Sequence, residues 1–146
     1  MQLSPYLYFA GNCEEAIAFY LQATGGQLTY KITWGEVPAE KKQQPQKQNS
    51  PSAEQPGDDK IMHALLHVGD GELQLCDSVE AVNYTGFAVS LSSNDPAEGK
   101  RWFDNLSQGG KVTLEWEETF WAAGFGTLID KFGVPWRINV NKPSTD

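Results

Sequence analysis

The sequence predicts an α+β fold of two tandem βαβββ modules that form a curved sheet with a central cleft. First, a chain of 146 residues, 40% hydrophobic and 12% aromatic, is long enough for one domain, 1–146, with a substantial core. Second, the order of strand, helix cap, helix and glycine pair occurs twice, which indicates an internal duplication. Third, more strands follow each glycine pair, so we expect module one in 1–80 and module two in 84–142.

Module one begins with the apolar strand PYLYF. Asn12 follows it as the expected N-cap of a helix, and Glu15 completes a capping box. Apolar side chains then recur at helical spacing and predict one buried stripe, made of Cys13, Ala16, Ile17 and Tyr20. The pair Gly25-Gly26 ends the helix, and QLTYKITW predicts a strand. KIMHALLHVGD and ELQLCDS predict two further strands joined by a tight turn.

Module two repeats this order. A strand is expected at 87–91, Asp95 is the expected cap, Pro96 takes the first helical position and Glu98 closes a capping box. The buried stripe of this helix consists of Gly99, Trp102, Phe103 and Leu106. After Gly109-Gly110, the segments TFWAAGFGTLID and VPWRINV predict strands, and Asp130 is an ordinary turn former between them.

Residues 35–59 match neither module. They are rich in Gln, Pro, Ser and charged residues, and such a segment buries too little apolar surface to offset the entropy of ordering it. We therefore expect a flexible loop between two strands. A lid over the cleft is the functional alternative.

The composition also excludes several partners. Eleven basic and nineteen acidic residues give a net charge of −8, and so acidic a surface repels nucleic acid and anionic membranes. Apolar runs stay below the roughly 18 residues of a membrane-spanning helix, and MQLSPYLYFAGN lacks the features of a signal peptide. Cys13 and Cys76 have no CxxC spacing, which favours buried, reduced thiols. These observations predict a cytoplasmic protein.

The phrases PYLYFAGNCEEAIAFY, DKIMHALLHVGDGELQLCDS and GGKVTLEWEETFWAAGFGTLIDKFGVPWRINV carry a family likeness. Through them the chain resembles the PhnB-like branch of the vicinal oxygen chelate superfamily, which includes glyoxalases, ring-cleaving dioxygenases and bleomycin-resistance proteins. The resemblance covers nearly everything except the insert and the last few residues. It implies the duplicated fold and, because such proteins commonly dimerise, a homodimer.

Members of this superfamily that use a metal hold it with His, Glu or Gln from the first and last strands of each half. At the corresponding places this chain has Pro5, Phe87 and Arg137, and its only candidates in the fourth strand are Gln74 and Asp77. Pro and Phe cannot coordinate a metal, and a guanidinium is a fixed cation. The resemblance therefore implies that the usual metal site is absent, and we expect no cofactor.

Two polar candidates remain for acid/base chemistry. His63 could pair with a carboxylate and act as a base, or be a satisfied structural histidine. His67 lies on the same face but roughly 13 Å away, too far to share one ion with it. Glu118 could point inward and pair with Arg137 to orient a polar ligand, or lie at a solvated strand end.

The segment EETFWAAGFGTLID has the composition of a strand that lines a site. Trp121, Phe125, Phe87 and Arg137 are the expected ligand-binding residues, and Gly124 and Gly126 leave room for a ligand or another backbone. We therefore predict a metal-independent protein that binds a small molecule. The alternative is a lyase, isomerase or dioxygenase-type enzyme with a non-standard metal or acid/base site. No GxSxG, P-loop, HExxH or dinucleotide motif is present, nor a glycine loop of the S-adenosylmethionine type.

Overall fold

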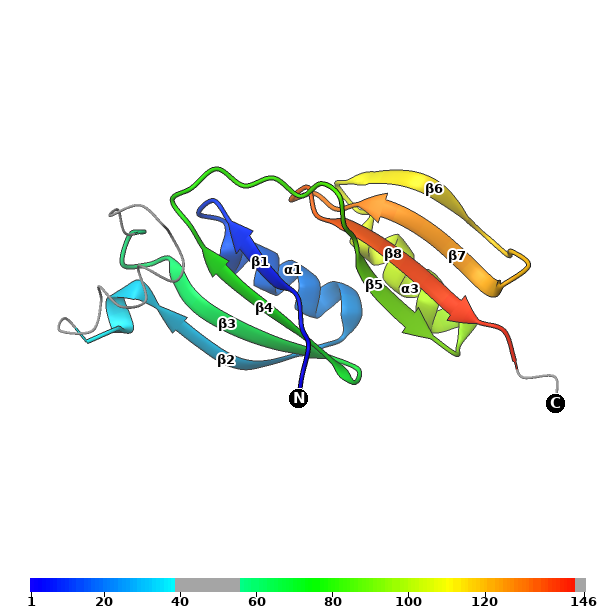
Figure 1. The fold of residues 1–146 in the computed structure, drawn as a ribbon, viewed down its shortest axis with the longest axis horizontal. Helices are drawn as coiled ribbons and strands as arrows, with labels where there is room; N and C mark the ends of the chain where they lie inside the picture. Colours follow the sequence, from blue (N-terminus) through cyan, green and yellow to red (C-terminus); the bar gives the residue numbers. More distant parts are fainter. Residues whose placement is uncertain (39–55, 144–146) are drawn as a thin grey trace. The chain divides into compact units, whose positions relative to one another are not determined.

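The computed structural model of the chain describes residues 1–38 and 56–143. The chain divides into two compact units, unit 1 from Met1 to Asn83 and unit 2 from Tyr84 to Asp146. Within the described residues, each unit has one four-stranded sheet and one α-helix that lies against one face of it (Figure 1). The α+β class with two tandem βαβββ modules is confirmed. The central cleft stays a prediction.

Unit 1 follows the predicted order of elements. They are β1 (Tyr6–Phe9), α1 (Cys13–Thr24), β2 (Gln27–Thr33), the 3-10 helix η1 (Trp34–Glu36), β3 (Ile61–Val68) and β4 (Gly71–Asp77). The strand order in the sheet is β1-β4-β3-β2, with β1 parallel to β4 and the other pairs antiparallel. The pairing of β1 with β4 thus brings the first and last strands of the unit together, although they are far apart in sequence.

The core of unit 1 lies between α1 and one face of the sheet. The predicted stripe of α1 is buried, and the ring centroid of its Tyr20 lies 6.4 Å from that of Phe9 in β1. Alternation along the strands supplies the opposing apolar side chains, which are Leu7, Phe9, Ala64, Leu66, Leu73 and Leu75. Burial of these two apolar surfaces against each other is the main stabilising contribution to the unit.

Unit 2 repeats this topology. Its elements are β5 (Val89–Ser93), α3 (Pro96–Leu106), β6 (Lys111–Glu117), β7 (Ala122–Ile129) and β8 (Pro135–Asn141), and its strand order is β5-β8-β7-β6. The predicted stripe of α3 is buried. The first strand begins at Val89, so the expectation of a strand at 87–91 is two residues early and Phe87 lies outside it.

The helices begin differently from the expectation. Asn12 makes no side-chain hydrogen bond at the start of α1; instead the Cys13 N–H donates to Asp77 Oδ1, 2.9 Å away. Asp95 does cap α3, accepting from the Ala97 N–H, and Pro96 takes the first position as predicted. Glu98, however, accepts from the Ser93 hydroxyl. The capping box expected at Glu98 is therefore replaced by a bond to the preceding strand.

Gly124 and Gly126 make room for aromatic side chains of unit 2 itself. A Cβ at Gly126 would lie 2.5 Å from Phe103 of α3, and one at Gly124 would lie 2.4 Å from Trp116 of β6. These distances are too short for real atoms, so any side chain there would displace a ring. The room expected for a ligand is occupied by the core.

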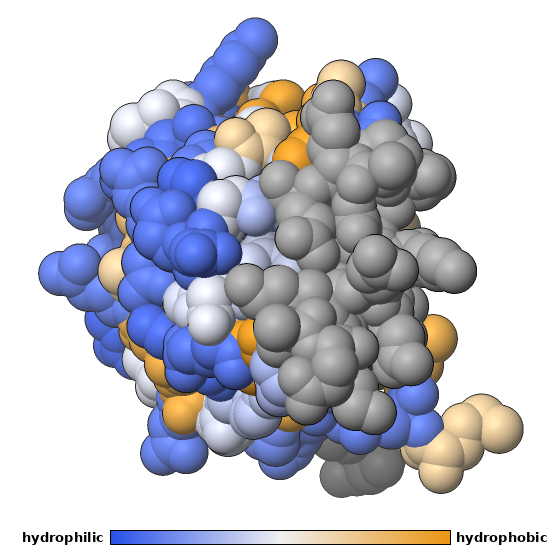
Figure 2. Space-filling model, turned by 90° about the vertical axis from the view of Figure 1, so that its left-hand side faces the viewer, coloured by the Kyte–Doolittle hydropathy of each residue, from blue (hydrophilic) through white to orange (hydrophobic). Residues whose placement is uncertain are grey.

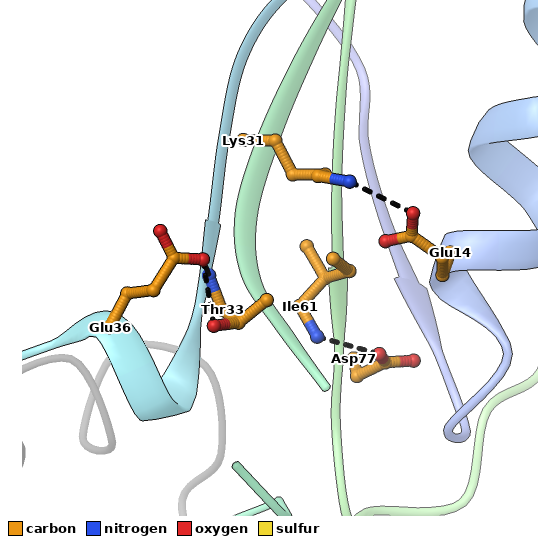
Figure 3. A network of polar contacts seen from close by, with 6 residues as sticks. All are labelled: Glu14, Lys31, Thr33, Glu36, Ile61 and Asp77. Carbon is orange, nitrogen blue, oxygen red and sulfur yellow. Dashed lines mark hydrogen bonds and ion pairs between the residues drawn. The ribbon is translucent and has the colours of Figure 1, made fainter. Parts of the chain in front are cut away.

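The expected loop or lid at 35–59 lies largely outside the described residues. Its described ends are bonded to the sheet. Glu36 of η1 accepts from both the backbone and the hydroxyl of Thr33 (Figure 3), which lowers the pKa of Glu36, and the Gly35 N–H donates to the Asp58 carbonyl. The described ends of the insert are thus bonded to each other, and one of them is bonded to the last residue of β2.

Hydrophilic residues predominate on the surface seen in Figure 2, where apolar residues form small patches. Among residues 1–38 and 56–143, no helix is long and apolar enough to cross a membrane.

Candidate functional site

Three of the predicted ligand-binding residues lie together in unit 2. The centroids of the Trp121 and Phe125 rings are 5.4 Å apart, and the guanidinium carbon of Arg137 lies 4.8 Å from the Phe125 centroid. We call Trp121, Phe125 and Arg137 the aromatic–arginine group. Phe125 lies in β7 and Arg137 in the adjacent β8, on the sheet face opposite α3 because Gly124 and Gly126 face the other way. The strand pairing therefore brings the cation over the ring.

A turn places Trp121 next to this pair. The Thr119 N–H donates to the Ala122 carbonyl, and the Ala122 N–H returns a bond to the Thr119 hydroxyl. Trp121 is 47% exposed, and Phe120 beside it is 88% exposed. The rings of Phe120 and Trp121 are therefore exposed to solvent, and Trp121 lies next to the buried Phe125.

Arg137 is a cation without a carboxylate partner in the described part of the chain. Its side chain is exposed, and the ion pairs among described residues involve other cations. A guanidinium over an aromatic face is held by cation–π attraction while its N–H groups stay available. The aromatic–arginine group thus combines a flat apolar surface with donors suited to an anion.

The other two residues expected near this group do not join it. Phe87 precedes β5, and its side chain is 45% exposed. Glu118 follows the last residue of β6, is 71% exposed and pairs with Lys142 at 3.5 Å. Of the two alternatives considered for Glu118, the structure agrees with the solvated strand end and not with the pair to Arg137, because the strand ends before its alternation could point Glu118 inward.

Unit 1 carries a second polar group, on the sheet face opposite α1. The pairing of the strands places Tyr6, Gln74, Leu65 and Tyr30 in one row across this face, and it pairs Tyr8 with Cys76 and Ile32 with His63. The Tyr6 hydroxyl lies 3.0 Å from Nδ1 of His63. The rings of Tyr6 and Tyr30 lie 5.7 and 5.8 Å from the imidazole centroid. His63 is thus held between two tyrosines.

Burial keeps this second group uncharged at neutral pH. It raises the pKa of Tyr6, with the nearby Cys76 adding to the effect, and raises the pKa of the Cys76 thiol to about 12. It lowers the pKa of His63, although Glu72 opposes the shift. His67 on the same strand lies instead at the exposed end, 3.2 Å from Glu72. The two histidines have separate partners, and His63 pairs with a hydroxyl rather than the carboxylate that was considered.

The positions that the family resemblance assigned to a metal do not fit one here. Asp77 Oδ1 accepts from the backbone N–H groups of Gly11 and Cys13, and its Oδ2 accepts from that of Ile61. The carboxylate is 1% exposed and saturated with N–H donors, so it is not free to coordinate. The Gln74 amide donates to the Ser4 hydroxyl, and Arg137 is a cation. Within the described ranges, no three His, Cys, Asp or Glu side chains cluster as a metal site.

Comparison with known proteins defines the class. A model of the glyoxalase/bleomycin resistance protein/dioxygenase superfamily matches residues 2–138, and the chain belongs to this superfamily. It is 49% identical over 144 residues to Protein YjdN of Escherichia coli (strain K12), covering 97% of each chain. The PhnB-like resemblance drawn from the sequence is in accord with these relatives.

Solved structures agree with the fold. The crystal structure of PA1353 from Pseudomonas aeruginosa is 37% identical, with a TM-score of 0.79 over 98% of this chain and 99% of that one. A Bacillus cereus PhnB protein, described as a putative 3-demethylubiquinone-9 3-methyltransferase, has a TM-score of 0.72 at 21% identity, over 96% of this chain and 99% of its own. At that identity the likeness shows the fold alone.

The sequence reasoning missed the tyrosines around His63. Tyr6 and Tyr8 were assigned only to an apolar strand, although their spacing of two in PYLYF places both rings on one face. That signal could have identified an aromatic face. It could not have identified His63 as the partner of Tyr6, because the pair lies 57 residues apart in sequence.

Proposed function

We propose that the protein binds a small anionic molecule that carries a flat ring, without a metal, through the aromatic–arginine group. The observation that carries the proposal is the guanidinium of Arg137 held over Phe125 beside the exposed ring of Trp121. The ring of the ligand would stack on Trp121, and its anion would accept hydrogen bonds from the guanidinium N–H groups of Arg137. In a chain of net charge −8, an exposed cation that has no carboxylate partner among the described residues is a specific attraction for such a ligand.

The oligomeric state and the cellular location are also proposals. A homodimer is proposed from the family likeness alone. A cytoplasmic location is supported by Cys13 and Cys76, which are both buried and free of disulfide bonds.

Tryptophan fluorescence tests the binding proposal. Trp121 is the most exposed of the five tryptophans, since Trp34, Trp102 and Trp136 are buried and Trp116 is half-buried. Quenching by an added ligand therefore reports mainly on Trp121. Benzoate and benzamide form a matched pair of probes, because they share the ring and differ in charge.

We expect benzoate to quench the fluorescence and benzamide to bind more weakly. Arg137→Gln should weaken benzoate binding by about tenfold or more, since it removes a charge-assisted hydrogen bond. Glu118→Gln is the control and should have no effect, because Glu118 is exposed and bonded elsewhere. Equal affinities of the wild type and Arg137→Gln for benzoate would refute the proposal.

The second candidate is an enzyme with a relocated acid/base group. The hydrogen bond between Tyr6 and His63 favours it, because a neutral imidazole held by a fixed partner can accept a proton. Stoichiometric metal in the purified protein that is lost on His63→Ala would favour this candidate over simple binding.

A further inference from the structure

Phe125 lies between two opposite charges on the sheet face opposite α3. Its strand, β7, runs between β8 and β6 in the sheet. From β8, Arg137 places its guanidinium carbon 4.8 Å from the centroid of the Phe125 ring. From β6, Glu117 is the direct partner of Phe125 in the strand register. Directly paired residues of antiparallel strands lie on the same face of a sheet, so Glu117 shares the face of Phe125 and Arg137.

The residue before Glu117 supports this direction of its side chain. Trp116 packs on the α3 side of the sheet, where its ring centroid lies 5.3 Å from that of Phe103 and where it fills the space beside Gly124. Successive side chains of a strand point to opposite faces. Glu117 therefore points away from α3, as its pairing with Phe125 requires.

Both charges are exposed and lack an ion-pair partner within the described ranges of the chain. The ion pairs there join other side chains, and Lys142 pairs with Glu118 rather than with Glu117. Glu117 and Arg137 also form no ion pair with each other, although they flank the same ring. A cation and an anion held apart on two sides of one aromatic ring match a molecule that carries both charges.

We propose that the ligand of the aromatic–arginine group is a zwitterion, a flat ring whose anion binds Arg137 and whose ammonium group binds Glu117. The proposal rests on the function proposed above and narrows its ligand class from ring anions to ring anions that also carry an amine. The strands that hold the two charges are separated by two strand spacings, or roughly 10 Å. The anion and the ammonium group therefore lie at opposite ends of the ligand ring.

The ammonium contact is tested with para-(aminomethyl)benzoate and para-ethylbenzoate, which share a carboxylate, a ring and a similar size but differ in one positive charge. Quenching of Trp121 fluorescence gives both dissociation constants, and their ratio expresses the preference for the amine. Glu117→Gln should reduce this preference by about two- to fivefold, the usual range for an exposed ion pair. Glu118→Gln is the matched control, because it removes the same charge one residue away from a carboxylate that pairs with Lys142. It should leave the ratio unchanged.

The outcomes distinguish this proposal from the one on which it rests. Benzoate binding that depends on Arg137, together with the same probe ratio in the wild type and in Glu117→Gln, would overturn the zwitterion and leave the anion site intact. Equal reductions of the ratio in Glu117→Gln and Glu118→Gln would indicate a general field of the acidic surface, and would overturn it as well. If none of the probes bound the wild type, both proposals would be refuted.

Discussion

The starts of the two helices differ although the units share one topology. In unit 1 the first turn of α1 is bonded by Asp77, which comes from the end of β4 and lies 64 residues from Cys13 in sequence. The same carboxylate accepts from the Ile61 N–H at the start of β3, 2.9 Å away (Figure 3). In unit 2 the cap comes from the neighbouring Asp95, whose side chain accepts from the Ala97 N–H at 3.0 Å.

Two units with the same topology can therefore be stabilised by different hydrogen bonds. A local cap stabilises one helix end, and its loss leaves the rest of the unit bonded. A buried carboxylate with three donors joins a helix, a loop and a strand, so its loss exposes several unsatisfied groups at once. Unit 1 should therefore depend on one side chain far more than unit 2 does.

The largest effect is expected for Asp77→Asn. The amide keeps one acceptor but directs a donor at a backbone N–H, so we expect unfolding to become easier by about 2–4 kcal/mol. Equilibrium urea unfolding measures this loss. A change of less than about 0.5 kcal/mol, within the range of ordinary surface substitutions, would show that Asp77 does not hold the unit together.

A smaller effect is expected for the local cap. Asp95→Ala should cost about 1 kcal/mol, the usual value for loss of an N-cap hydrogen bond. Asn12→Ala is the matched control in unit 1, where the side chain at the cap position makes no such bond. Its effect should stay within about 0.5 kcal/mol, as for a surface residue. Equal losses for the two variants would contradict the observed difference between the helix starts.

The smallest effect is expected for the pH dependence of stability. It concerns unit 1 alone, because both histidines of the chain lie there. The pKa of His63 is lowered by burial, so the unfolded chain binds this proton more readily than the folded chain. Stability should therefore fall as pH drops from about 6.5, the ordinary histidine value, toward the lowered one.

Urea unfolding at stepped pH measures this slope, and NMR titration locates the midpoint of His63. His63→Gln should flatten the slope, whereas His67→Gln is the comparison within the same strand. A wild-type midpoint for His63 at or above the ordinary histidine value would reverse the expected sign.

Much of each unit could be predicted because it depends on local patterns. The buried stripes of α1 and α3 follow from helical spacing, and Asp95 and Pro96 lie beside the groups that they affect. Errors occurred where two local patterns competed. Phe87 continued an apolar run that the chain does not use as strand. The inward alternative for Glu118 extended the alternation of a strand that ends one residue earlier.

By itself the amino-acid sequence determined the class, the duplication, the helix stripes and the aromatic character of EETFWAAGFGTLID, because periodicity sets which side of an element is apolar. Tertiary structure alone decided the partners: Asp77 with α1 and β3, Tyr6 with His63, and Arg137 with Phe125 rather than Glu118. The physical reason is that a pattern specifies the face on which a side chain lies. Its hydrogen-bond or ring partner depends on which strands become neighbours and in which register they pair.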